Sequence, residues 1–229
     1  NELSSNMKTF DPVWNEIYGK GQQLNKYPYS SIVSFLFSNA SPVRSDGSRT
    51  ELLEIGCGAG NNLWFAAREG FAVTGLDASD SALEFARQRF AEDGLQGQFD
   101  LGDFTSLPYA DNQFDIAFER AALSQTPKTS ARKAVAEISR VLRPGALFYA
   151  ELYSDRVTSR GTKTKDGLMI DVEGPYSGVG QIGFYSRNEI ENLFDGRLKI
   201  QGLSHSETHH LLHGPIEVQA HWSVIARAD

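Results

Sequence analysis

Short apolar runs alternate with segments of helical periodicity through the middle of the chain. The runs lie near residues 52–55, 71–76, 97–101, 114–118 and 146–152, and each has the length of a buried strand. Between two of them, apolar side chains recur at helical spacing at Leu83, Ala86 and Phe90. Alternating strands and helices predict a mostly parallel sheet with helices on both faces.

The two ends of the chain depart from this alternation. Residues 198–203 and 217–226 predict two further strands, which could pair as a terminal hairpin. Before residue 45, an aromatic-rich stretch with helical spacing predicts two short helices. Residues 153–186 have no clean periodicity, and a loop of this length inside a compact domain is usually functional. We expect this insertion to cover a substrate.

Local patterns indicate where several helices begin. The capping-box spacing of Ser81 and Glu84 predicts one helix start, and Thr126 followed by Pro127 predicts another. The run beginning at Ser186 predicts a short helix that ends near Phe194.

Composition limits the class of protein. The chain has 229 residues, of which 40% are hydrophobic, which suits one α/β domain with additions. No apolar run has the length of a membrane-spanning helix, so we expect no membrane partner. The single cysteine, Cys57, excludes an intramolecular disulfide, and we expect a cytoplasmic protein. A net charge of -7 argues against nucleic acid as a partner. We expect a monomer or a homodimer.

A glycine-rich turn follows the first predicted strand. It contains Gly56, Gly58 and Gly60 and precedes a helical pattern, so it forms the front half of a βαβ unit. Asp77 ends the second strand about 20 residues later, where an acid can accept hydrogen bonds from ribose hydroxyls. This arrangement predicts a cofactor that contains a nucleoside, although a plain glycine turn in an unrelated α/β fold has a similar pattern.

The details of the turn favour one cofactor class. The dinucleotide fingerprint requires a third small residue for close helix packing, but Asn61 stands at that position. The G-x-G-x-G run preceded by Glu54 instead resembles motif I of the class I S-adenosylmethionine-dependent methyltransferases. The resemblance covers roughly residues 50–152 and, more loosely, the terminal hairpin. It implies an α/β, Rossmann-like, doubly wound sheet of seven strands in the order 3-2-1-4-5-7-6.

The resemblance also implies S-adenosyl-L-methionine as cofactor and S-adenosyl-L-homocysteine as product. Glu54 and the glycines would line the methionine side, Asp77 would hold the ribose, and Asp103 would bind the adenine amino group beside Phe104. Residues 1–45 would form a helical lid on a single methyltransferase domain, 46–229, although their aromatic side chains could equally be core at the sheet edge. The cofactor-binding residues expected on this basis are Trp14, Tyr18, Tyr27, Glu54, Gly56, Cys57, Gly58, Gly60, Asn61, Asn62, Asp77, Ala78, Asp103, Phe104, Glu119 and Arg120.

Candidate catalytic groups lie near the carboxyl ends of the predicted strands, where open α/β sheets bind ligands. Methyl transfer requires a base only when the acceptor must lose a proton. Four of the five histidines fall in residues 204–213, which we expect to connect the last two strands. That segment could supply a base, bind a metal through His209 and His213 if it is helical, or be a solvated loop; we expect no metal. The candidate bases are Glu119, Glu151, Tyr153, His209 and His210.

The residues after the fourth strand narrow the acceptor. Amino-methylating enzymes of nucleobases often have Asn-Pro-Pro-Tyr there, whereas this chain has Glu119-Arg120-Ala121-Ala122. The only cysteine lies in the cofactor loop, so no thiol is placed for methylation at pyrimidine carbon five. We therefore expect methyl transfer to oxygen or nitrogen of a small molecule such as a sugar, metabolite or natural-product intermediate. The alternatives are a non-catalytic cofactor-binding module, an NAD(P)-dependent dehydrogenase, and a methyltransferase acting on RNA or protein.

Overall fold

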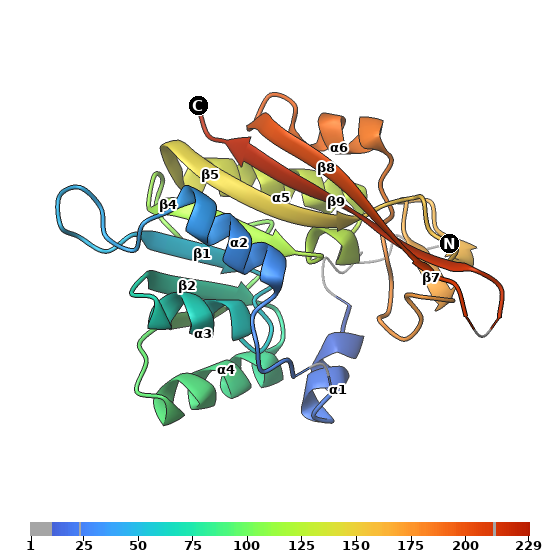
Figure 1. The fold of residues 1–229 in the computed structure, drawn as a ribbon, viewed down its shortest axis with the longest axis horizontal. Coiled ribbons are helices and arrows are strands. Elements are labelled where there is room, and N and C mark those ends of the chain that lie inside the picture. Colours follow the sequence, from blue (N-terminus) through green and yellow to red (C-terminus); the bar gives the residue numbers. More distant parts are fainter. Residues whose placement is uncertain (1–10, 23, 213) are drawn as a thin grey trace, which may run out of the picture.

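A seven-stranded sheet runs through the centre of the computed structural model, which describes residues 11–22, 24–212 and 214–229 (Figure 1). The strand order is β3-β2-β1-β4-β5-β9-β8, which confirms the order 3-2-1-4-5-7-6. The first five strands are parallel, and β9 is antiparallel to both β5 and β8. The strands are β1 (Glu51–Ile55), β2 (Ala72–Asp77), β3 (Gln98–Leu101), β4 (Phe114–Arg120), β5 (Leu142–Tyr153), β8 (Lys199–His210) and β9 (Glu217–Arg227).

Helices cover both faces of the sheet, and each face has its own apolar core. One core packs the sheet against α5 and α6, through Val135 and Phe148 among others. The other packs it against α2, α3 and α4, where Phe35 stacks on Tyr149 with ring centroids 4.8 Å apart. Burial on both faces explains why the central strands are apolar runs without alternation. The helices are α1 (Val13–Gly19), α2 (Ser30–Asn39), α3 (Asn61–Arg68), α4 (Asp80–Glu92), α5 (Lys128–Val141) and α6 (Arg187–Phe194), with a 3₁₀ turn, η1, at Leu123–Gln125.

Two helices have N-cap residues other than those predicted. Ser79, not Ser81, caps α4, because Ser79 is still extended and its Oγ accepts from the Ala82 N–H at 3.3 Å. Pro127, not Thr126, is the N-cap of α5, and no side chain caps that helix. The start of α6 at Ser186 is confirmed, with a complete capping box.

The insertion at 153–186 has more structure than its sequence pattern suggested. It contains a two-stranded antiparallel sheet of β6 (Arg160–Lys163) and β7 (Met169–Glu173), which the sequence analysis did not predict. Both strands are short and mostly exposed, so they carry little of the alternation from which strands are recognised.

The two predicted helices before residue 45 are present as α1 and α2. Helix α1 is joined to the start of α4 by Asn15, whose Oδ1 accepts from Ser79 Oγ at 2.9 Å and from Ser81 Oγ at 2.8 Å. Only Ile17 of this helix is buried. A role for residues 11–45 as a lid stays a prediction, and residues 1–10 lie outside the described part of the chain.

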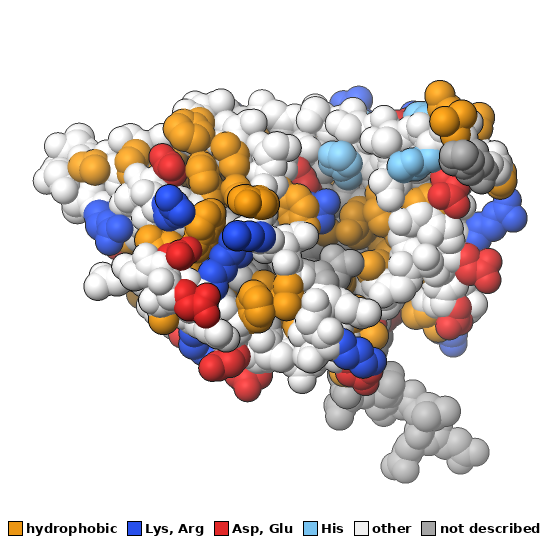
Figure 2. All heavy atoms as spheres, turned by 60° about the horizontal axis from the view of Figure 1, so that its bottom comes forward, with side chains coloured by type: hydrophobic (Ala, Val, Ile, Leu, Met, Phe, Trp, Pro, Cys, Tyr) orange, Lys and Arg blue, Asp and Glu red, His pale blue; other side chains and the backbone are white. Residues whose placement is uncertain are grey.

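Charged side chains of both signs are distributed over the surface (Figure 2). On the face in Figure 2, acidic and basic side chains are interspersed around a hollow, and the described Lys and Arg residues do not gather into one patch there. None of the helices in the described ranges is long and apolar enough to cross a membrane.

Candidate active site

The turn between β1 and α3 is built from backbone that only glycine suits well. Gly56 and Gly58 have φ values of 64° and 52°. A Cβ on Gly56 would lie 2.4 Å from the Ala122 Cβ, and one on Gly58 would lie 2.5 Å from the Tyr18 hydroxyl. Side chains at these two positions would therefore close the space above the turn.

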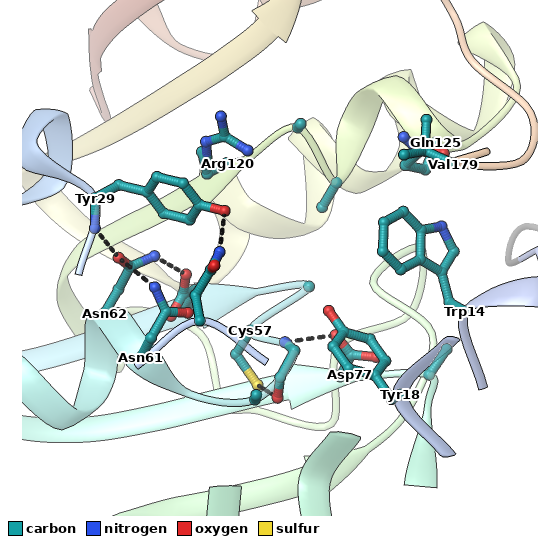
Figure 3. A pocket seen from close by; sticks show the side chains of 18 of the residues that line it. Trp14, Tyr18, Tyr29, Cys57, Asn61, Asn62, Asp77, Arg120, Gln125 and Val179 are labelled. Atoms are coloured by element: carbon teal, nitrogen blue, oxygen red, sulfur yellow. Dashed lines mark hydrogen bonds between the residues drawn. The ribbon is translucent and has the colours of Figure 1, made fainter. Parts of the chain in front are cut away.

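A cavity of about 260 Å3 lies above this turn, at the carboxyl ends of the parallel strands (Figure 3). This is the edge of the sheet at which open α/β sheets bind ligands. Side chains from α1, the glycine turn, β2, β4 and the insertion surround it. This main cavity is lined by Asp11, Trp14, Tyr18, Asn25, Tyr29, Glu54, Gly56, Cys57, Gly58, Ala59, Asn61, Asn62, Asp77, Ala78, Phe104, Arg120, Ala121, Ala122, Gln125, Tyr153 and Val179.

Glu54 presents an unused acceptor at the main cavity. Its side chain is 2% exposed, and Oε1 accepts from Asn62 Nδ2 at 2.7 Å. Oε2 is buried without a hydrogen-bond partner among the described residues. Burial raises the pKa of Glu54 well above its usual value, and nearby Asp77 and Glu119 raise it further. A cationic donor at Oε2 would offset the free-energy cost of burying the ionised carboxylate and would lower the pKa of Glu54 again.

Asp77 is held in place by the backbone. Its Oδ2 accepts from the Gly58 N–H at 2.8 Å, and its Oδ1 accepts from the Ser79 N–H at 2.8 Å. Burial raises its pKa, although these bonds act in the opposite direction. Each carboxylate oxygen retains a free lone pair for a ligand hydroxyl. Figure 3 shows Tyr18 of α1 beside Asp77, and burial together with the Asp77 charge raises the pKa of Tyr18.

Asn61 and Asn62 connect the glycine turn to the segment before α2. The Tyr29 N–H donates to Asn62 Oδ1 at 3.0 Å, and Asn61 Nδ2 donates to the Tyr27 carbonyl at 2.9 Å. The Tyr27 side chain does not line the main cavity, and the residue is 69% exposed. Tyr27 contributes its backbone carbonyl to this network, and its contact with a cofactor stays a prediction.

Glu119 and Arg120 point to opposite faces of the sheet, as neighbours in a strand must. The Arg120 guanidinium carbon lies 3.9 Å from the Tyr29 ring centroid, at the boundary of the main cavity. Glu119 is fully buried on the other face, where its Oε2 accepts from the Leu123 N–H at 3.1 Å. Burial raises the pKa of Glu119 to about 8. Glu119 does not line the main cavity, and its Oε1 is buried without a hydrogen-bond partner among the described residues, so its expected roles at the site stay predictions.

Two other expected cofactor residues lie outside the lining. Gly60 begins α3 in the left-handed region but does not border the main cavity. Asp103 is also outside it, and its Oδ1 accepts from the Thr105 N–H at 2.8 Å. Phe104 and Ala78 do line the cavity. Of the lining residues that the sequence analysis missed, Tyr29 belonged to the aromatic stretch it noted, but nothing in the sequence marked Gln125 or Val179.

The histidine-rich segment was expected to connect the last two strands. Most of it is instead part of a strand, because β8 continues through His210. His209 and His210 are exposed and line neither cavity; His209 Nε2 lies 3.1 Å from Glu207 Oε2. His213 lies outside the described residues, and the described part of the chain contains no cluster of three side chains that could hold a metal ion.

A second cavity, of about 210 Å3, adjoins the main one and shares Arg120, Ala121 and Tyr153 with it. Tyr153, one of the candidate bases, lies at this boundary, and burial raises its pKa to about 12, so it keeps its proton at neutral pH. The histidine at this cavity is His221, which the sequence analysis did not select. The remaining lining residues are Glu151, Tyr176, Thr208 and Gln219.

Comparisons with known proteins agree on one family. A family model described as "Methyltransferase domain" matches residues 52–145. "Sterol methyltransferase-like 2" from Botryococcus braunii is 40% identical over 101 residues, 43% of this chain and 25% of that protein. "Fatty-acid O-methyltransferase" from Mycolicibacterium smegmatis is 31% identical over 147 residues, 63% of this chain and 49% of that protein. The chain thus spans a quarter to a half of the length of these relatives.

A solved structure supports the fold over most of the chain. A SAM-dependent methyltransferase from Methanosarcina mazei superposes with a TM-score of 0.68 at 22% identity, covering 88% of this chain and 98% of that one. The chain contains a class I S-adenosylmethionine-dependent methyltransferase domain. The methyltransferase sheet with its terminal antiparallel hairpin is therefore the fold of residues 51–227.

The cofactor of this family is S-adenosylmethionine, whose sulfonium supplies an activated methyl group. The residues present fit it. The unpartnered Glu54 oxygen can accept from an ammonium group, and the glycines at 56 and 58 let Ala122 and Tyr18, which line the main cavity, pack directly on the backbone of the turn. Asp77 offers a fixed carboxylate for ribose hydroxyls.

Proposed function

We propose that this protein transfers the methyl group of S-adenosylmethionine to an oxygen or nitrogen atom of a small-molecule acceptor. The observation that carries the proposal is the direct junction of two cavities. The main cavity has the residues that fit the cofactor, and it shares Arg120, Ala121 and Tyr153 with a second, polar cavity. A donor in one and an acceptor in the other would meet at this boundary.

Backbone geometry at the boundary supports a functional role. Ala121 has a φ of 63°, which is unusual for a residue with a Cβ. Its N–H donates to the Glu151 carbonyl at 2.9 Å, which holds the turn at the end of β4. Strained backbone of this kind is retained mainly where the surrounding structure requires it, and it is frequent at ligand sites.

The proton of the acceptor has two candidate destinations. An acceptor hydroxyl must lose a proton as its oxygen forms the new bond to carbon, and Glu151 and His221 both line the second cavity. Positioning supplies the rest of the rate enhancement, since bringing two reactants together in the right orientation lowers the barrier substantially.

We also propose that α1 and the segment that follows it cover the bound cofactor. Trp14 and Tyr18 both line the main cavity from α1. Trp14 Nε1 is buried and finds no acceptor among the described residues, so a ligand in the cavity can supply one. Such a cover excludes water from the reacting groups.

Thermal unfolding with S-adenosylhomocysteine, S-adenosylmethionine and NAD in parallel tests the cofactor. Binding to the native state at a hundredfold excess over Kd stabilises a protein by about 2.7 kcal/mol. We expect a clear increase in Tm with both sulfur nucleosides and none with NAD. A shift with NAD alone would overturn the proposal, and release of S-adenosylhomocysteine from a panel of acceptors distinguishes an enzyme from a binding module.

A further inference from the structure

The second cavity brings together side chains from four strands and the insertion. Pairing of β4 with β5 places Arg120 opposite Glu151, and pairing of β5 with β9 places Tyr153 opposite His221. Thr208 of β8 lies opposite Gln219 of β9 in the same way. Because residues two apart in a strand share a face, all of these side chains lie on one face of the sheet. Tyr176 completes the wall from the insertion.

Among the described residues that line this cavity, Arg120 is the only lysine or arginine, and its guanidinium has N–H donors without a hydrogen-bond partner. Its Nε lies 3.4 Å from Glu151 Oε2, and its guanidinium is stacked on Tyr29. Its two terminal nitrogens make no hydrogen bond to any described residue. The stack and the ion pair hold the guanidinium plane in place, so these donors are oriented before a ligand arrives.

Glu151 is not similarly free. Its Oε1 accepts from the Tyr149 hydroxyl at 2.8 Å, while Oε2 faces Arg120. The carboxylate is 7% exposed. The remaining polar lining groups are on Thr208, Gln219, Tyr176 and His221. The Arg120 guanidinium has more unused capacity than the Glu151 carboxylate, because none of its five N–H donors makes a hydrogen bond to a described residue and its Nε is buried without a partner.

We propose that the second cavity binds the methyl acceptor, and that this acceptor is a small carboxylic acid carrying hydroxyl groups, whose carboxylate pairs with Arg120. The inference rests on the proposed function and adds a substrate class to it. A planar carboxylate matches the two terminal N–H groups of a guanidinium. A phosphate dianion fits less well, because Glu151 already neutralises part of the single positive charge. Arg120 is thereby assigned to the acceptor rather than to the cofactor.

The experiment measures ligand binding to the protein saturated with S-adenosylhomocysteine. The probes are D-gluconate, D-glucuronate and 4-hydroxyphenylacetate, each paired with its primary amide, and glucose 6-phosphate as the phosphate probe. Saturation-transfer NMR and calorimetry give the affinities. We expect at least one acid to bind about tenfold more tightly than its amide, which corresponds to about 1.4 kcal/mol. Absence of any such preference, or a preference for glucose 6-phosphate, overturns the assignment.

Three variants locate the effect. Arg120→Gln should remove the preference for the acid and leave the Kd of S-adenosylhomocysteine within about threefold, while Arg120→Lys should retain part of the preference. Glu151→Gln keeps an acceptor for Tyr149 but removes a negative charge beside Arg120, so it should strengthen acid binding. Arg132→Gln, on the exposed side of α5, is the matched control.

The outcomes separate this inference from the proposed function. If Arg120→Gln weakens S-adenosylhomocysteine tenfold and leaves acid binding unchanged, Arg120 belongs to the cofactor and the inference is wrong. If amines bind and are lost in Glu151→Gln, the acceptor is cationic and the inference is again wrong. Failure of the unmodified protein to bind S-adenosylhomocysteine would instead count against the proposed function itself.

Discussion

Asn62 Nδ2 donates a hydrogen bond of 2.7 Å to Glu54 Oε1. The same amide accepts from the Tyr29 N–H through its oxygen, so one side chain orients the buried acid and holds the segment that leads into α2. An asparagine is suited to this position because it offers a donor and an acceptor on one planar group. Asn61, at the position where dinucleotide-binding proteins have a small residue, instead donates from Nδ2 to the Tyr27 carbonyl at 2.9 Å.

We expect Asn62→Asp to lower both stability and cofactor affinity. The aspartate cannot donate to Glu54 and places a second carboxylate beside a buried one, which costs about 1–3 kcal/mol. Chemical denaturation and calorimetry with S-adenosylhomocysteine measure the two effects. Asn192→Asp, on the exposed side of α6, is the control. Equal stability of Asn62→Asp and the control would show that the bond to Glu54 is dispensable.

Asp77→Asn should weaken S-adenosylhomocysteine by about tenfold or more, because it replaces a charge-assisted bond to the ribose with a neutral one. The amide keeps the shape of the side chain but only one acceptor oxygen, so it loses the bond from either the Gly58 or the Ser79 N–H group and some stability with it. Circular dichroism checks folding and calorimetry gives the Kd. Asp195→Asn, at the exposed end of α6, serves for comparison. A normal Kd would remove Asp77 from the binding site.

Glu119 should make the protein less stable as the pH rises. Its pKa is about 8 in the folded protein because of burial, whereas an unfolded glutamate titrates near 4.5. Between these values the folded state holds a proton that the unfolded state has released, so the free energy of unfolding falls with rising pH and levels off above about 8. Glu119→Gln removes this contribution.

Urea unfolding of the unmodified protein and Glu119→Gln at pH 5, 6.5 and 8 tests this dependence. The variant should gain stability relative to the unmodified protein as the pH rises, by an amount on the order of a few kcal/mol. Glu54 also has a raised pKa, which Glu119 helps to raise, so Glu119→Gln should lower the pKa of Glu54 and change the difference in the same direction. A difference that is constant across the three pH values would contradict the assignment.

Helix α1 should become more protected when cofactor binds. It has only one buried residue, Ile17, and it contributes Trp14 and Tyr18 to the main cavity. Segments with few buried contacts open readily, and a ligand that contacts them raises their protection. Hydrogen exchange of residues 13–19 with and without S-adenosylhomocysteine measures this, with α5 as an internal reference. Unchanged exchange would argue that α1 is a fixed part of the core and not a lid.

His221→Ala should reduce turnover more than the double replacement of His209 and His210 by alanine. His221 lines the second cavity, whereas His209 and His210 are exposed and do not line it. The comparison uses kcat and KM for the acceptor that the panel identifies, together with the Kd of S-adenosylhomocysteine, which none of these changes should alter. The opposite order of effects would restore the sequence-based proposal for His209 and His210.

The amino-acid sequence by itself determined the succession of the central strands, the glycine turn and the positions of Glu54 and Asp77. These features are local: an apolar run, a turn that needs positive φ and the end of the next strand follow one another within about 25 residues, so short-range pattern is sufficient to place them. The family resemblance then supplied the cofactor, and the terminal hairpin agreed with it.

Only the tertiary structure decided the second cavity. Arg120, Glu151 and His221 come from three strands, and their meeting depends on strand register, which a one-residue shift would reverse. The continuation of β8 through His210 also moved the histidines away from the site. No pattern along the chain encodes these placements, because they arise from pairing between segments that are distant in sequence.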